Sequence, residues 1–167
     1  MDAISEEILG PRLVDSIQET LETMVGCTDV ERISALELEA IEIQEHAPSI
    51  IAFIGVASGY AGACSVYATI ELARKLTAGL LCIDDPSEVS DAELKDAYGE
   101  LANMICGGLK NRCDADGIHF ALSLPVVMTM PIRVAPHYPE GVGVTCAAVR
   151  THGSELEVQV CMQPLKD

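Results

Sequence analysis

The amino-acid sequence predicts an α+β fold, in which helices pack on a mostly antiparallel sheet. Some segments repeat apolar residues at spacings of three and four, which is typical of a helix, and others alternate, which is typical of a strand. These segments follow one another in the order helix, strands, two helices, strands. Because each element must bury its apolar face against another, this order favours helices layered on one sheet. At 167 residues the chain has the length of one domain, which we expect to span residues 1–167.

The first half of the chain is predicted to contain a helix, one strand, a hairpin and a second helix. These elements fall at residues 9–25, 30–45, 50–68 and 70–81. In the first helix, Pro11 lies in the first turn, where proline is tolerated, and Gly26 ends the helix. The alternation of apolar and polar residues in the predicted strand shifts once. A β-bulge at Ala40 would account for this shift, and a strand without a bulge is the alternative.

The predicted hairpin lies in a run without charge, residues 47–70, that is long enough to span a bilayer. Glycines interrupt the middle of the run, and no basic anchor precedes it. Two buried strands, at 50–57 and 62–68, explain the run better than a membrane helix, with a turn at residues 58–62 between them. We therefore expect no membrane partner.

The second half is predicted to contain a long helix, a strand, a loop and a closing hairpin. These elements fall at residues 91–112, 118–124, 131–143 and 144–162. A turn signal at residues 114–117 ends the helix, and Pro125 ends the strand. In the closing hairpin, strands at 144–150 and 156–162 are joined by a turn at 152–154.

Composition narrows the classes of partner and site. The formal net charge of −16 argues against nucleic acid and anionic membranes as partners, because both need a basic patch. Seven cysteines, an odd number without a C-x-x-C pair, suit buried, reduced thiols in a cytoplasmic protein, and no signal peptide is visible. The four histidines lack the spacing of metal ligands, so the sequence predicts no metal site; they are His46, His119, His137 and His152.

The predicted helix at 91–112 carries polar residues opposite its apolar stripe. Ser90 and Glu93 form a capping box at its start. The stripe has helical spacing and consists of Leu94, Tyr98, Leu101, Ile105 and Leu109. At about 100° per residue, the opposite face carries Asp96, Glu100, Asn103 and Gly107. Gly107 lowers helix propensity but leaves room for another molecule to come close. The alternative interpretation is a solvated helix face with an incidental Glu and Asn.

This face resembles the signature of the CheC/CheX/FliY chemotaxis phosphatases. The pattern is Asp96-x-x-x-Glu100-x-x-Asn103, with Pro125 following after a strand, and residues 51–62 are similar to the family's glycine-punctuated hairpin. CheC-type members typically carry two Glu-x-x-Asn motifs. The second asparagine of this chain, Asn111, has Gly108 at the Glu position, so the resemblance is to the CheX-like branch with one motif.

The resemblance implies an α+β fold of the CheC/CheX type and hydrolysis of the aspartyl phosphate on a CheY-like response-regulator receiver. It implies that Asn103 positions the attacking water and that Glu100 pairs with a receiver lysine. Asp96 and Gly107 would contact the partner. Mg²⁺ would reside on the receiver, with no cofactor bound by this chain. Members of this branch resemble homodimers joined through their sheets, and the alternating apolar residues of the closing hairpin offer edges for such pairing.

Two other classes of function stay open on the sequence. A domain of this type could bind a receiver or a flagellar switch protein without catalysis, since fold does not fix function. It could also be an acidic dimeric scaffold with no link to a receiver. The presence of both Glu100 and Asn103 favours the enzyme.

Overall fold

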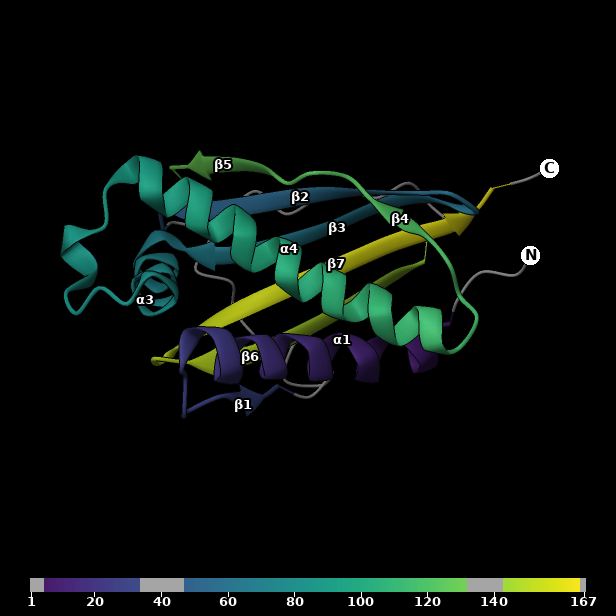
Figure 1. Ribbon diagram of the computed structural model, residues 1–167, viewed down its shortest axis with the longest axis horizontal. Coiled ribbons are helices and arrows are strands. Elements are labelled where there is room, and N and C mark those ends of the chain that lie inside the picture. The colour runs from purple at the N-terminus through teal and green to yellow at the C-terminus, as the bar shows by residue number, and fades with distance from the viewer. Residues whose placement is uncertain (1–4, 34–46, 132–142, 166–167) are drawn as a thin grey trace.

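The computed structural model describes residues 5–33, 47–131 and 143–165. Within these ranges, helices pack on one seven-stranded sheet in which every pairing is antiparallel, so the predicted α+β fold is confirmed (Figure 1). The helices are α1 (Glu6–Thr20), which continues as a π-turn (Leu21–Val25), α3 (Ile70–Leu81) and α4 (Asp91–Ala115). The strands are β1 (Glu31–Arg32), β2 (Ser49–Ala57), β3 (Tyr60–Thr69), β4 (Ala121–Leu122), β5 (Val126–Met130), β6 (Val144–Thr151) and β7 (Ser154–Pro164).

The core lies between the sheet and the helices. The strand order is β1-β6-β7-β3-β2-β4, and β5 also pairs with β2. In Figure 1, α4 runs diagonally in front of the sheet, α1 lies beside β6 and α3 lies at the end where α4 begins. The side chains of Ile50 and Ile54 from β2, Leu13 and Ile17 from α1, and Leu101 from α4 have no exposed surface. This shared core holds α4 against the sheet.

The hairpin of β2 and β3 is confirmed, but its predicted turn at 58–62 is wrong. The turn consists of two residues, Ser58 and Gly59, which both have positive φ angles of 66° and 87°, as tight hairpin turns require. Gly62 instead pairs with Val56 inside the sheet. A Cβ atom at Gly62 would lie 1.9 Å from the carbonyl oxygen of Cys161, so this glycine allows β3 and β7 to approach each other. No helix among the described residues is long and apolar enough to cross a membrane.

The strand predicted at 118–124 is shorter in the structure, and the sequence prediction lacks β5. β4 covers only two residues, because at Ser123 the side chain, in place of the backbone carbonyl, accepts a hydrogen bond from β2. The backbone N–H of Gly55 donates to Ser123 Oγ at 2.8 Å, and the N–H of Ser123 donates to the Gly55 carbonyl at 2.9 Å. After Pro125 the chain pairs with β2 again as β5, in which Val126 lies opposite Phe53.

Several other boundaries differ from the sequence prediction. In the segment predicted as one strand at 30–45, β1 holds two residues, and Ala40 with the rest of 34–46 lies outside the described residues. Most of the loop predicted at 131–143 also lies outside them. Helix α4 continues three residues beyond the predicted end at 112. The closing hairpin is confirmed, with a two-residue turn at His152 and Gly153.

The prediction of buried cysteines holds for most of the seven. All seven are free thiols, and four are buried: Cys27, Cys64, Cys106 and Cys113. A hydrogen bond with the Cys64 thiol, together with burial, raises the pKa of Cys106 well above its ordinary value. The prediction is wrong for Cys82, which is exposed because it caps the end of α3 with a φ angle of 55°.

Candidate functional site

Helix α4 begins at a well-defined cap. The predicted capping box is present: Ser90 Oγ accepts from the Glu93 N–H at 3.3 Å, and the Ser90 N–H donates to Glu93 Oε2 at 2.9 Å. Hydrogen bonds from the Ser90 side chain and backbone lower the pKa of Glu93. Arg74 of α3 bonds to the Val89 carbonyl and pairs with Asp91. These contacts fix the direction in which α4 leaves the cap.

The inner face of α4 is the predicted stripe. All five of its residues are buried: Leu94, Tyr98, Leu101, Ile105 and Leu109. The Tyr98 hydroxyl has no hydrogen-bond partner among the described residues. Burial raises the pKa of Tyr98 well above its ordinary value, and the neighbouring Tyr67 adds to the shift. Tyr98 is therefore a core residue, as the sequence predicts.

The outer face of α4 presents the four candidate site residues. Asp96 and Glu100 are exposed, and Asn103 and Gly107 are partly exposed. Within the described part of the chain, the side chains of Asp96, Glu100 and Asn103 form no hydrogen bond or ion pair. Glu100 and Asn103 are three residues apart on one helix, so their side chains are neighbours on its surface. Their donors and acceptors are free to engage a second molecule.

Three glycines of α4 occupy different surroundings. A Cβ atom at Gly107 would have nothing within 4 Å, so this position is open to solvent beside Asn103. A Cβ atom at Gly108 would lie 2.2 Å from Ser16 Oγ on α1, and one at Gly99 would lie 3.1 Å from Val127 Cγ2 on β5. Gly108 and Gly99 thus let α1 and β5 pack closely against α4. Sequence reasoning singled out Gly107 and missed the other two, because their neighbours are distant in sequence.

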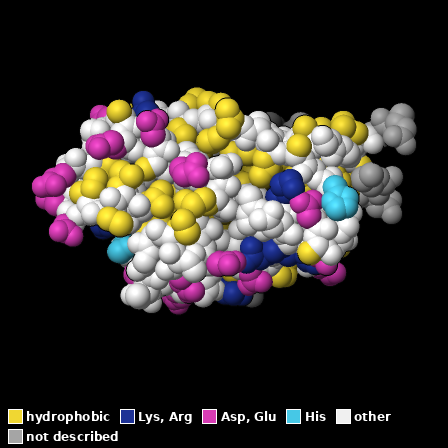
Figure 2. Space-filling view, viewed as in Figure 1, with side chains coloured by type: hydrophobic (Ala, Val, Ile, Leu, Met, Phe, Trp, Pro, Cys, Tyr) yellow, Lys and Arg dark blue, Asp and Glu magenta, His cyan; other side chains and the backbone are white. Residues whose placement is uncertain are grey.

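Negative charge gathers around the start of α4. Seven exposed carboxylates lie between residues 84 and 100, with Lys95 as the one basic residue in that stretch: Asp84, Asp85, Glu88, Asp91, Glu93, Asp96 and Glu100. Figure 2 shows acidic side chains over the end of the molecule where α3 and the start of α4 lie. Such a surface attracts a partner that presents a cation.

The far end of α4 is tied down by ion pairs. Arg12 of α1 donates to Asp116 Oδ2 from Nε at 2.7 Å, and Arg112 pairs with Glu19. The Lys110 ammonium lowers the pKa of Asp114, and His119, whose Nδ1 lies 3.0 Å from Asp114 Oδ1, lowers it further. With both ends of the helix fixed, Glu100 and Asn103 lie on a rigid element, which favours an accurate site.

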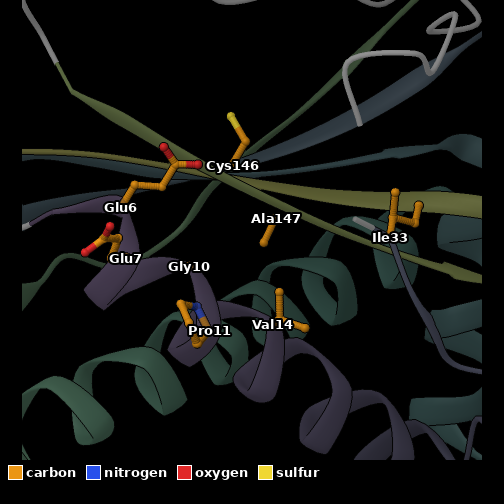
Figure 3. A pocket seen from close by; sticks show the side chains of 8 residues that line it. All are labelled: Glu6, Glu7, Gly10, Pro11, Val14, Ile33, Cys146 and Ala147. Atoms are coloured by element: carbon orange, nitrogen blue, oxygen red, sulfur yellow. The ribbon is translucent and has the colours of Figure 1, made fainter. Parts of the chain in front are cut away.

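A separate hollow lies where the start of α1 faces β6 (Figure 3). Its volume is about 340 Å³, and it is lined by Glu6, Glu7, Gly10, Pro11, Val14, Ile33, Cys146 and Ala147. Apart from the two glutamates the lining is largely apolar, and it includes no residue of α4. The hollow therefore does not contribute to the candidate site.

Comparison with known protein families gives a match over a range that contains α4. Residues 50–134 match the family model described as chemotaxis phosphatase CheX, and this range includes all four candidate site residues. No curated protein sequence matches the chain.

Solved structures share the fold. The chemotaxis protein CheX from Vibrio vulnificus is 22% identical with a TM-score of 0.75, over 94% of this chain and 99% of that one. CheX from Desulfovibrio desulfuricans is 21% identical with a TM-score of 0.72, over 93% and 99%. The CheX–CheY–BeF3–Mg²⁺ complex from Borrelia burgdorferi contains a chain that is 17% identical with a TM-score of 0.68, over 92% and 96%.

Proposed function

Because the chain belongs to the family of chemotaxis phosphatase CheX, we propose that it hydrolyses the aspartyl phosphate of a CheY-like response-regulator receiver. The observation that carries this proposal is the pair Glu100 and Asn103 on the outer face of a helix fixed at both ends, where neither side chain bonds to another described residue. The Borrelia relative, solved as a complex with CheY, supports a partner of this type.

Asn103 is the residue we propose to act on the attacking water. Hydrolysis of an acyl phosphate needs a water in line with the bond that breaks, and little covalent chemistry. The Asn103 carboxamide can accept a hydrogen bond from a water and donate another, so it can hold that water in line. The water oxygen then forms a bond to phosphorus, and the bond from phosphorus to the aspartyl oxygen breaks. Both protons of the water stay with the inorganic phosphate that leaves as H2PO4⁻, and the aspartate carboxylate is restored.

Glu100 is the residue we propose to fix the docking register. Its carboxylate is exposed one helical turn before Asn103, and a charge-assisted contact to a receiver lysine would align the two molecules. Asp96, one turn further back, extends the same acidic surface. Gly107 leaves the next turn open, so no side chain at position 107 would stand between the receiver and Asn103. The receiver would hold the Mg²⁺.

We also propose that the protein forms a homodimer, on the resemblance to the CheX-like branch. The strand order limits which edge of the sheet could pair with a second copy of the chain. β7 lies between β6 and β3. Among the described strands, β6 is therefore the one strand of the closing hairpin with a side that is not fully paired, and β1 covers its residues Val149 and Arg150. Val158 and Val160 of β7 face the core and are buried, so they cannot take part in pairing between copies.

The proposed reaction is tested by phosphate release from CheY-like receivers charged with acetyl phosphate, measured with and without the protein. The proposal expects faster release with the protein, and binding to the phosphorylated receiver. Binding without faster release would instead support a non-catalytic receiver-binding module. Neither binding nor release with a panel of receivers would contradict both functions.

A further inference from the structure

Three potential metal ligands meet away from α4. Cys27 and Asp29 lie in the segment between the π-turn and β1, and His152 lies in the turn between β6 and β7. Cys27 Sγ and His152 Nε2 are 3.7 Å apart, and the ligand atoms of all three side chains lie within 4.8 Å of one another. The cysteine is buried and the other two are exposed, so the cluster opens to solvent on one side.

Both segments are held in place by their own hydrogen bonds. Gly26 takes a φ angle of 78°, which lets the Cys27 N–H donate back to the Leu21 carbonyl at 3.0 Å. The Asp29 carboxylate accepts from Thr151 Oγ1 at 2.6 Å and from the His152 N–H at 2.7 Å. Each carboxylate oxygen keeps a second acceptor direction, because an ionised carboxylate has about four. These hydrogen bonds therefore hold the three potential ligands near one another without an ion.

The donor types, and the distance between the sulfur and the nitrogen, fit zinc. At ordinary bond lengths to tetrahedral Zn²⁺, a cysteine sulfur and a histidine nitrogen are about 3.6 Å apart, close to the distance between Cys27 and His152. A sulfur, a nitrogen and an oxygen donor suit Zn²⁺, whereas Mg²⁺ and Ca²⁺ take oxygen ligands. Three protein ligands leave a fourth position for water, on the open side of the cluster.

We propose that Cys27, Asp29 and His152 form a Zn²⁺ site with a water as fourth ligand. Binding exchanges the thiol proton of Cys27 for the metal, and that proton passes to solvent. The ion would join the end of the π-turn to the β6–β7 turn. The site shares no residue with α4 and is independent of the proposed phosphatase activity, so each can be tested without the other.

Calorimetric titration of the EDTA-treated, reduced full chain with Zn²⁺ tests the site. We expect one equivalent to bind, and at least about 100-fold weaker binding in Cys27→Ser and in His152→Asn, since loss of a ligand exceeds the effect of losing an outer contact. Asparagine suits position 152 because it tolerates the φ angle of 51° there. Cys82→Ser and His119→Asn, which change exposed residues outside the cluster, should bind as the parent does.

Substitution with Co²⁺ gives a second readout that needs no variant. A thiolate-to-cobalt charge-transfer band with one equivalent of Co²⁺ would show sulfur ligation in the parent protein. The proposal is overturned if the parent binds no Zn²⁺ at micromolar concentration, or if Co²⁺ binds without that band. It is also overturned if folded Cys27→Ser and His152→Asn bind with parental affinity, because exposed carboxylates would then hold the ion.

Discussion

Ser16 of α1 lies directly against Gly108 of α4. The Ser16 hydroxyl donates to the Ile105 carbonyl at 2.6 Å, and it lies where a side chain at position 108 would begin, 2.2 Å from a Cβ atom built there. Ser16 is buried, so its hydroxyl needs this hydrogen bond. The contact limits the distance between α1 and α4. Because Asn103 is part of α4, the contact also helps to position Asn103.

Replacement of Gly108 by alanine should destabilise the protein. The new methyl group would push Ser16 away from the Ile105 carbonyl or separate the two helices, and overpacking of this kind costs about 1–3 kcal/mol. The free energy of unfolding, measured by urea titration, checks this expectation. An unchanged midpoint would mean that the helices adjust without cost.

Gly107→Ala is the matched control and should act in the opposite direction. A methyl group at 107 meets no atom within 4 Å, and alanine favours a helix by about 1 kcal/mol over glycine. The free protein should therefore become more stable by up to about that amount. If the receiver approaches here, the same variant should bind the phosphorylated receiver more weakly. Parental binding would remove Gly107 from the docking surface.

Tyr98→Phe should leave the protein as stable or make it more stable. The Tyr98 hydroxyl is fully buried without a partner among the described residues, and an unsatisfied buried polar group costs about 1–3 kcal/mol. Its removal recovers part of that cost, offset by any space left behind. Thermal and urea unfolding measure the change. A clear loss of stability would show that the hydroxyl has a hydrogen bond in solution.

Glu100→Gln should weaken binding to the phosphorylated receiver. The substitution removes the charge but keeps the size, so it tests the proposed contact with a receiver lysine. Binding of the parent should also depend more steeply on salt than binding of the variant. Titration against a receiver carrying beryllofluoride measures both, with Glu7→Gln on α1 as the control. Equal affinities and salt slopes would show that Glu100 is only a solvated helix residue.

The proposed dimer has a direct test by light scattering after size exclusion. Each chain has a mass of 17.8 kDa, and the expected particle has twice that mass at micromolar concentration. A mass of one chain at every accessible concentration would contradict the dimer, and with it part of the case for the CheX-like branch.

The sequence predicts α4 well because its signals are local. The capping box, the stripe from Leu94 to Leu109 and the exposed Glu100 all depend on helical periodicity within one element, and the structure confirms them. The turn predicted at 58–62 is too long, because a glycine such as Gly62 is typical of turns while here it lies in β3. Its role depends on Cys161, nearly one hundred residues away.

Other features escape sequence reasoning because tertiary contacts create them. β5 follows Pro125 without alternating apolar and polar residues, and only its pairing with β2 makes it a strand. The contacts of Gly108 with Ser16 depend on two helices meeting. Cys27 and His152 are 125 residues apart, so ligand spacing along the chain could not reveal their approach.

The central claim is that Asn103 positions the water that attacks the phosphate. The chain offers a matched control in Asn111, its one other asparagine, which is exposed on the same helix two turns further on. The decisive measurement is the rate of phosphate release from a charged receiver with the parent, Asn103→Ala and Asn111→Ala. Asn103→Ala should reduce the stimulated rate by about 10²–10³, the scale for losing one positioned polar group, while its stability stays within about 0.5 kcal/mol and Asn111→Ala keeps full activity. Full activity in folded Asn103→Ala would contradict the claim.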